Sequence, residues 1–158
     1  MKATQKSLEL QLSLLQSLNA KVAKLNIAVN RVRTLRRQLS ELEKRLSSES
    51  VALLAQTKIL ASSLLAVEGV LVDVKRESSR DVLRHPAGLN DTLSDMIGVV
   101  AIADEAPTSQ ARQVSEEIMA KVDIELAKLD KLFTDEVAAL NLKLRGAGIE
   151  VLGGTQAA

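Results

Sequence analysis

The stretch that decides the fold is SLLQSLNAKVAKLNIAVNRVRTLRRQLSELEKRL, residues 13–46. Its apolar residues recur in alternating steps of three and four, with one extra three-residue step at Leu35. The series is Leu15, Leu18, Val22, Leu25, Val29, Val32, Leu35, Leu39, Leu42 and Leu46. This spacing places the series on one side of an α-helix, as in a helix that packs along another long helix.

No Gly or Pro interrupts the chain from Lys6 to Ser47, so the sequence predicts one continuous helix there. At 1.5 Å per residue it would be roughly 60 Å long, which a compact globule cannot cover. A second long helix must therefore lie beside it. Arg37 and Glu41, four residues apart, are placed to pair on its exposed side.

A second amphipathic helix is predicted after a serine-rich turn at 47–50 and ends near Arg76. Its apolar positions are Leu53, Leu60, Leu64, Val67, Leu71 and Val74, widened by Leu54, Ala61, Leu65 and Val72. The polar segment 76–88 then contains Pro86 and Gly88, both helix breakers, and is predicted to be a loop.

Two further helices follow this loop. A short one has its apolar face at Leu89, Leu93, Met96, Ile97 and Val100, with Asn90 or Asp91 as the expected N-cap. The last is long, with Pro107 or Thr108 at its start. Its apolar positions are Ala111, Val114, Ile118, Val122, Leu126, Leu129, Phe133, Val137, Leu140 and Leu144. Gly146 and Gly148 are placed to end it with a left-handed cap.

These elements predict an all-α fold, an antiparallel bundle of long helices in one domain, residues 1–149. The second and third helices together nearly match the first in length, which favours three rods with an interrupted middle rod. The alternative is a four-helix up-down-up-down bundle, in which the short helix doubles back. Residues 150–158 are predicted to form a flexible C-terminal tail.

Composition narrows the possible chemistry. Apolar residues make up 46% and charged residues 26%, while Phe133 is the only aromatic. The absence of Cys excludes disulfides, thiolate catalysis and Cys-based zinc sites. The lone His85 cannot build a multi-His metal site, and no Glu-x-x-His motif for a di-metal bundle site occurs.

Charge is unevenly distributed, although the formal net charge is +1. Residues 1–40 carry a formal charge of about +7, and residues 91–140 about −7. We therefore expect the first and last helices to attract each other within one molecule.

The basic cluster RVRTLRRQ, residues 31–38, could bind nucleic acid or phosphate. Three features argue against this: Val32 and Leu35 belong to the apolar series, acidic residues follow at 41 and 43, and no aromatic can stack on a base. We interpret the arginines as residues that flank the buried stripe.

Acidic residues gather in LNDTLSDMIGVVAIADEAPTSQAR, residues 89–112: Asp91, Asp95, Asp104 and Glu105. Paired carboxylates can perform acid–base chemistry. However, no nucleophile–base pair accompanies them, and an acid in a first helical turn stabilises the helix dipole. We interpret them as capping and solvent-facing residues, and Gly98 as a close-packing position. No catalytic, cofactor-binding or metal-binding residue is assigned.

No secretion signal or membrane span is predicted, and localisation stays open. The start, MKATQKSLELQLSLLQS, lacks an unbroken apolar segment. The most apolar run, residues 59–74, contains Glu68 and Asp73 and is too short and too polar to span a bilayer.

The segments at 25–46, 89–93, 98–111 and 135–149 together resemble the C-terminal helical region of bacterial BNR-repeat, sortilin-like β-propeller proteins, which are often annotated glycosyl hydrolases. The matching pattern is Leu-Asn-x-x-Leu followed by Gly-x-Val-x-x-Ala-Asp-x-Ala-Pro-Thr-x-Gln. It falls on Leu89, Asn90, Leu93, Gly98, Val100, Ala103, Asp104, Ala106, Pro107, Thr108 and Gln110. The resemblance covers about residues 20 to 150.

Any glycosidase activity of that family would belong to the propeller, whose Ser-x-Asp-x-Gly-x-x-Trp signature this Trp-free chain lacks. The resemblance therefore implies a noncatalytic accessory domain, a spacer or docking surface beside a β-propeller, and a family that is often exported. The alternative is a free-standing coiled-coil scaffold that self-associates into a homo-oligomer.

Overall fold

The computed structural model describes residues 4–46, 50–73, 87–102 and 105–153. Every regular element in these ranges is helical, which confirms the all-α prediction. The elements are α1 (Gln5–Arg45), α2 (Val51–Leu71), α3 (Leu89–Ile102), α4 (Ser109–Lys131), the π-helical segment η3 (Leu132–Val137) and α5 (Ala138–Gly146).

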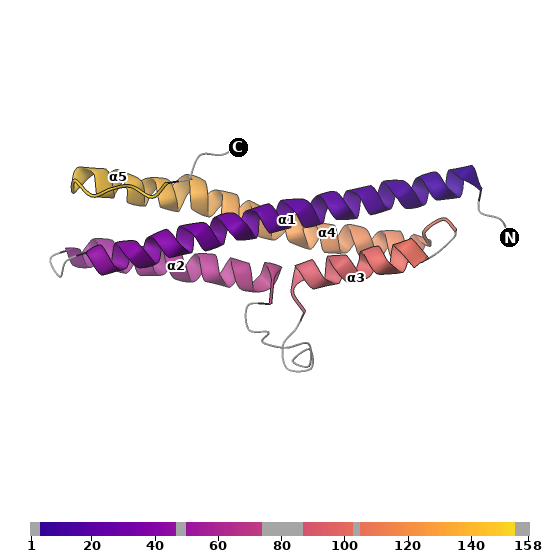
Figure 1. The fold of residues 1–158 in the computed structure, drawn as a ribbon, viewed down its shortest axis with the longest axis horizontal. Helices are drawn as coiled ribbons and strands as arrows, with labels where there is room; N and C mark the ends of the chain where they lie inside the picture. Colours follow the sequence, from indigo (N-terminus) through magenta and orange to yellow (C-terminus); the bar gives the residue numbers. More distant parts are fainter. Residues whose placement is uncertain (1–3, 47–49, 74–86, 103–104, 154–158) are drawn as a thin grey trace.

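The helices form three rods (Figure 1). The first rod is α1, which runs nearly the whole length of the molecule. The second consists of α2 and α3, which lie end to end along α1, and the third is the continuous run of α4, η3 and α5. The three-rod arrangement is therefore the correct one of the two predicted, and α3 does not double back.

The core lies along the α1 stripe, as its spacing predicts. The buried α1 residues are Leu18, Leu25, Val29, Val32, Leu35, Leu39 and Leu42. Opposite them, the other rods bury Leu60, Leu64, Val67 and Leu71, then Leu93, Met96 and Val100, then Ile118, Val122, Leu129, Phe133, Val137, Leu140 and Leu144. Because each rod buries only one side, no rod is stable without the other two.

Two helix ends are capped as predicted. The Thr108 side chain accepts a hydrogen bond of 3.0 Å from the backbone N–H of Ala111 and so begins α4. After α5, Gly148 has φ +69, the left-handed conformation that favours glycine, and the N–H of Ile149 donates to the carbonyl of Leu144 at 2.9 Å.

The interruption of the middle rod differs from the prediction at both ends. Helix α2 ends at Leu71, before the expected Arg76, because the next residue, Val72, is extended. Helix α3 begins at Leu89, with the Thr92 N–H donating to the Gly88 carbonyl at 3.2 Å. The prediction of Asn90 or Asp91 as its N-cap is therefore wrong. Most of the predicted loop, residues 76–86, lies outside the described residues.

Two glycines differ in how closely other backbone approaches them. A Cβ atom on Gly88 would lie 2.8 Å from the backbone N of Asp73 and 2.8 Å from Cα of Val72, so the chain closes on itself where the middle rod is interrupted. Gly98, predicted as a close-packing position, is exposed, and its Cβ would meet nothing within 4 Å. The close contact between backbones is at Gly88.

The first residues of the predicted C-terminal tail contact the helices. Leu152 is 4% exposed, and its backbone is hydrogen-bonded to the side chain of Asn141 on α5. Residues 150–152 thus make contacts that the sequence did not predict, while the flexibility of the tail stays a prediction. Residues 154–158 lie outside the described part of the chain.

We predict that Gly88→Ala lowers the free energy of unfolding by about 1–3 kcal/mol, because its methyl group would be forced against backbone atoms. The matched control, Gly98→Ala, should raise it by about 0.5–1 kcal/mol, because alanine is the better helix former and the site is open. Urea denaturation measures both. Equal effects of the two substitutions would contradict the close contact at Gly88.

Candidate functional site

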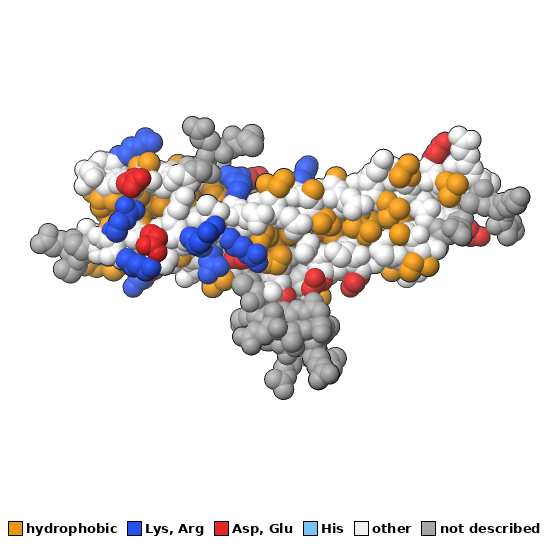
Figure 2. Space-filling view, viewed as in Figure 1, with side chains coloured by type: hydrophobic (Ala, Val, Ile, Leu, Met, Phe, Trp, Pro, Cys, Tyr) orange, Lys and Arg blue, Asp and Glu red, His pale blue; other side chains and the backbone are white. Residues whose placement is uncertain are grey.

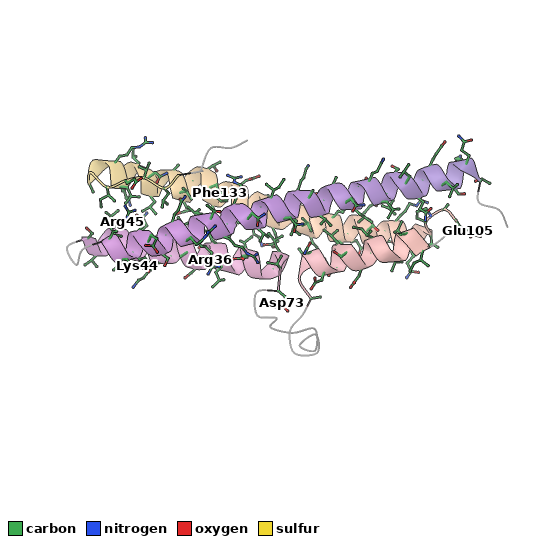
Figure 3. The ribbon with its side chains drawn as sticks, viewed as in Figure 1. Arg36, Lys44, Arg45, Asp73, Glu105 and Phe133 are labelled. Carbon is green, nitrogen blue, oxygen red and sulfur yellow. The ribbon has the colours of Figure 1, made fainter. Side chains whose placement is uncertain are left out.

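A buried carboxylate joins the first two rods. Glu68 of α2 is 1% exposed, and its two oxygens accept hydrogen bonds from Arg33 Nε and Arg36 Nη1 of α1, each at 2.7 Å. Figure 3 shows Arg36 on α1 above α2. We call Arg33, Arg36 and Glu68 the arginine clamp. The arginines of residues 31–38 were predicted from the sequence to flank the buried stripe, but Glu68 was not predicted as their partner.

The two charges of the clamp differ in their access to water. The arginine side chains are 53% and 34% exposed, whereas the carboxylate is enclosed. Removing a carboxylate from water costs several kcal/mol, and only close, hydrogen-bonded partners offset that cost. The clamp therefore stabilises one register of α1 against α2. Arg33 and Arg36 are paired with Glu68 within the molecule.

A third arginine of the same cluster points to the last rod. The guanidinium carbon of Arg31 lies 4.2 Å from the ring centroid of Phe133, in the range of a cation–π contact. Residues 31–36 thus contact both neighbouring rods. Figure 2 shows Lys and Arg side chains gathered over the C-terminal half of α1, and the clamp shows that two of these arginines have intramolecular partners.

Phe133 lies in the π-helical segment η3, which the sequence analysis missed. The buried positions before it, Ser115, Ile118, Val122, Glu125 and Leu129, alternate between steps of three and four, but Phe133 and Val137 follow in two steps of four. The wider i→i+5 turn keeps these residues on the buried side. The predicted apolar series already has three steps of four in a row from Val114 to Leu126, where the helix is regular, so its spacing gave no indication of this segment. In the same rod, the structure buries Ser115 and Glu125, while Val114, expected inside, is 37% exposed.

A groove lies between α2 and the third rod beside η3. It encloses about 540 Å³, with Ser63, Ala66, Val67 and Val70 of α2 on one side. The other side consists of Glu125, Lys128, Lys131, Leu132, Asp135 and Glu136. Lys128 Nζ donates to Glu125 Oε1 at 2.6 Å. One wall of the groove is therefore apolar, and the other carries both positive and negative charge.

Other predicted charge interactions have mixed outcomes. Lys21 of α1 pairs with Asp123 of α4, as the charge asymmetry predicts. Glu41 pairs with Lys44 at 2.8 Å instead of with Arg37, and this hydrogen bond holds the pKa of the exposed Glu41 carboxyl below its ordinary value.

The acidic residues of segment 89–112 that the structure describes are spread along α3 and its connection to α4. Asp91 lies half-buried in the first turn of α3, Asp95 is exposed one turn later, and Glu105 is exposed between α3 and α4. Asp104 and His85 lie outside the described residues. In the ranges that the structure describes, no group of three or more His, Cys, Asp or Glu side chains is placed to hold a metal ion.

Helix α2 is apolar on more than its buried side. Among the described helices it alone is long and apolar enough to cross a membrane by length and composition, with a mean hydropathy of 1.4 over its most apolar window, of which 28% is buried. In the structure it packs on α1 and α4, with Glu68 turned inward. The absence of a membrane span stays a prediction.

Comparisons with protein-family models, curated proteins and solved structures find no match to this chain.

We predict an asymmetric response when the clamp is broken. Arg33→Ala with Arg36→Ala should lower the free energy of unfolding by about 3–5 kcal/mol, because the enclosed Glu68 would lose both partners. Glu68→Met should be neutral or stabilising, because the half-exposed arginines can turn to water. Urea denaturation checks both variants. If Glu68→Met lowers the free energy of unfolding as much as the double arginine substitution does, the loss does not come from leaving the enclosed carboxylate without partners.

Proposed function

We propose that this chain is a noncatalytic helical module that acts as a spacer and docking surface. Two features support the mechanical part of the proposal. Helix α1 contains 41 residues without a break, and the clamp and the core hold the other two rods along it. A rod of this kind keeps two attached partners at a fixed separation of roughly 60 Å.

The observation that carries the docking part is the side of α2 turned away from α1. Its exposed apolar residues are Val51, Ile59, Leu65 and Val70, which are between 42% and 67% exposed. Between them lie the small exposed residues Ala52, Ala55, Ser62, Ala66 and Gly69, and Lys58 is the one charged residue. We call this set the α2 outer face.

A continuous apolar surface of this kind is uncommon on a protein that works alone. A helix that is apolar all round is normally covered on all sides, whereas α2 is covered only where it faces α1 and the third rod. The small residues allow a partner's backbone to approach closely, and the 540 Å³ groove beside Ala66 and Val70 extends the surface towards η3. The α2 outer face is therefore the docking surface of the proposal.

The proposed partner is an apolar surface of a neighbouring protein domain. The resemblance of residues 20–150 to the helical region of BNR-repeat, sortilin-like proteins suggests a β-propeller as that domain. Sequencing the coding region upstream tests this part: a propeller encoded in frame supports it, and an unrelated neighbour contradicts it. Turnover of sialidase or glycosidase substrates by this chain alone would overturn the noncatalytic part.

The second candidate is a self-associating scaffold, and the α2 outer face also favours it. The exposed positions Ala52, Ala55, Ile59, Ser62, Ala66 and Gly69 alternate in steps of three and four, the spacing of a coiled-coil seam. Two copies could pair along such a seam. The two candidates differ in the mass that each predicts for the purified chain.

We predict a monomer of about 17 kDa by light scattering, because docking to a different domain leaves the purified chain single. A dimer would instead support the scaffold. Ile59→Glu with Val70→Glu should then restore the monomer, because buried carboxylates would oppose pairing. The control Ile27→Glu changes an equally exposed apolar residue on α1 and should leave the mass unchanged. A dimer that survives the paired substitution would exclude the α2 outer face as the interface.

A further inference from the structure

The C-terminal segment fills a space between two rods. The Cα atoms of α1 and α5 all lie more than 8 Å apart, and residues 149–153 run back along α5 (Figure 1). Arg45 of α1 pairs with Glu150 at 3.4 Å on one side, and Asn141 of α5 binds Leu152 on the other. Gly153 ends the described segment next to Gln38 of α1. We call this space the tail groove.

Asn141 holds the segment by its backbone. Its side-chain Oδ1 accepts from the Leu152 N–H at 2.8 Å, and its Nδ2 donates to the Leu152 carbonyl at 3.3 Å. Asn141 is 9% exposed, so this amide is enclosed together with the residue it binds. Any extended residue offers the same N–H and carbonyl, so Asn141 recognises an extended backbone whatever its sequence.

Side-chain selection in the tail groove comes from other contacts. Leu152 is 4% exposed and belongs to the apolar core, so the groove selects an apolar side chain at that position. Arg45 selects an acidic side chain two residues earlier, the position of Glu150. Val151 also packs against the core, whereas a Cβ on Gly153 would meet only Gln38 Nε2 at 3.9 Å. The bound pattern is therefore an acid, an apolar residue and leucine.

The tail groove is larger than its occupant. About 510 Å³ lies open beside residues 150–153, lined also by Arg37, Gln38 and Glu41 of α1. A hollow of about 320 Å³ continues past Gly153 to Arg31 and Phe133. Gln38 lines the 510 Å³ space, and its buried Oε1 has no hydrogen-bond partner among the described residues, so a bound backbone N–H could use this acceptor.

The segment can leave without unfolding a helix. The chain turns at Gly148, after α5 has ended. Departure breaks the hydrogen bonds of Asn141 and Arg45 and exposes Leu152, Ile149 and Val151, which pack in or against the core. The α2 outer face takes no part in this arrangement.

We propose that the tail groove is a peptide-docking site which the chain's own C-terminal segment occupies in cis. Its partner is an extended segment of another protein with the pattern acid-apolar-leucine. The tethered segment competes at a local concentration of the order of millimolar, so it acts as a built-in inhibitor of that partner. This goes beyond the proposed function, since it adds a second docking site of different chemistry.

The experiment uses the full chain and a fluorescent peptide, GAGIEVLGGT, which copies residues 146–155. In the Leu152→Asp chain the cis segment should leave the groove, because a carboxylate cannot occupy the apolar position. We expect this chain to bind the peptide at least about tenfold more tightly than the unchanged chain, as measured by fluorescence anisotropy. Leu152→Ala, which is milder, serves if the first variant does not fold.

Controls separate the groove from nonspecific binding. Adding Asn141→Leu to Leu152→Asp should abolish binding while circular dichroism shows the helices intact. A peptide with Asp in place of leucine should not bind, and one with Lys in place of glutamate should bind several-fold more weakly. Equal binding by all chains, or no binding by either Leu152 variant, overturns the proposal. If the chain forms a concentration-dependent dimer and Leu152→Asp abolishes it, the tail of a second copy occupies the groove. That result would overturn the proposal that the partner is a different protein.

Discussion

The apolar stripe that α1 buries from Leu18 to Leu42 is the constraint from which the rest of the structure follows. A helix that long cannot bury its stripe against itself, so other helices must run beside it for its whole length. The middle rod is too short to do this as one helix. It covers α1 in two pieces, α2 and α3, and the chain closes tightly at Gly88 so that the interruption leaves the line of the rod intact.

The arginine clamp complements this apolar constraint. An apolar stripe with a repeating spacing can be paired in several registers, because one turn of shift replaces leucine by leucine. The clamp can form in only one of these registers, because Glu68 is enclosed and only Arg33 and Arg36 are placed to donate hydrogen bonds to it. Shifting α2 by one turn would leave an unpaired carboxylate inside the molecule, which is far more costly than a poorer apolar fit. Polar specificity is therefore built into the most apolar helix.

The sequence predicted what depends on local spacing and missed what depends on distant partners. The α1 stripe, the Thr108 cap and the left-handed glycine after α5 each follow from residues within a few positions of one another. The partner of Arg33 lies on another helix, and the partner of Leu152 lies across a turn. Gly88 and Gly98 show the same difference, because a glycine has no side chain to indicate whether another backbone lies against it. Asn141 resembled any polar residue on an exposed helix side, and only the returning tail reveals its role.

The two proposed surfaces supply different parts of recognition. The α2 outer face is nearly uncharged, so it can provide affinity by burying apolar area but gives a partner little to fix its orientation. The tail groove combines an enclosed amide, an apolar position and an arginine, which together fix the direction and register of a bound strand. Both surfaces depend on α1, which supports α2 on one side and forms a wall of the groove on another. The rods hold the apolar surface and the groove at a fixed position relative to each other. Such an arrangement would let a spacer orient one bound partner against another, which a flexible linker cannot do.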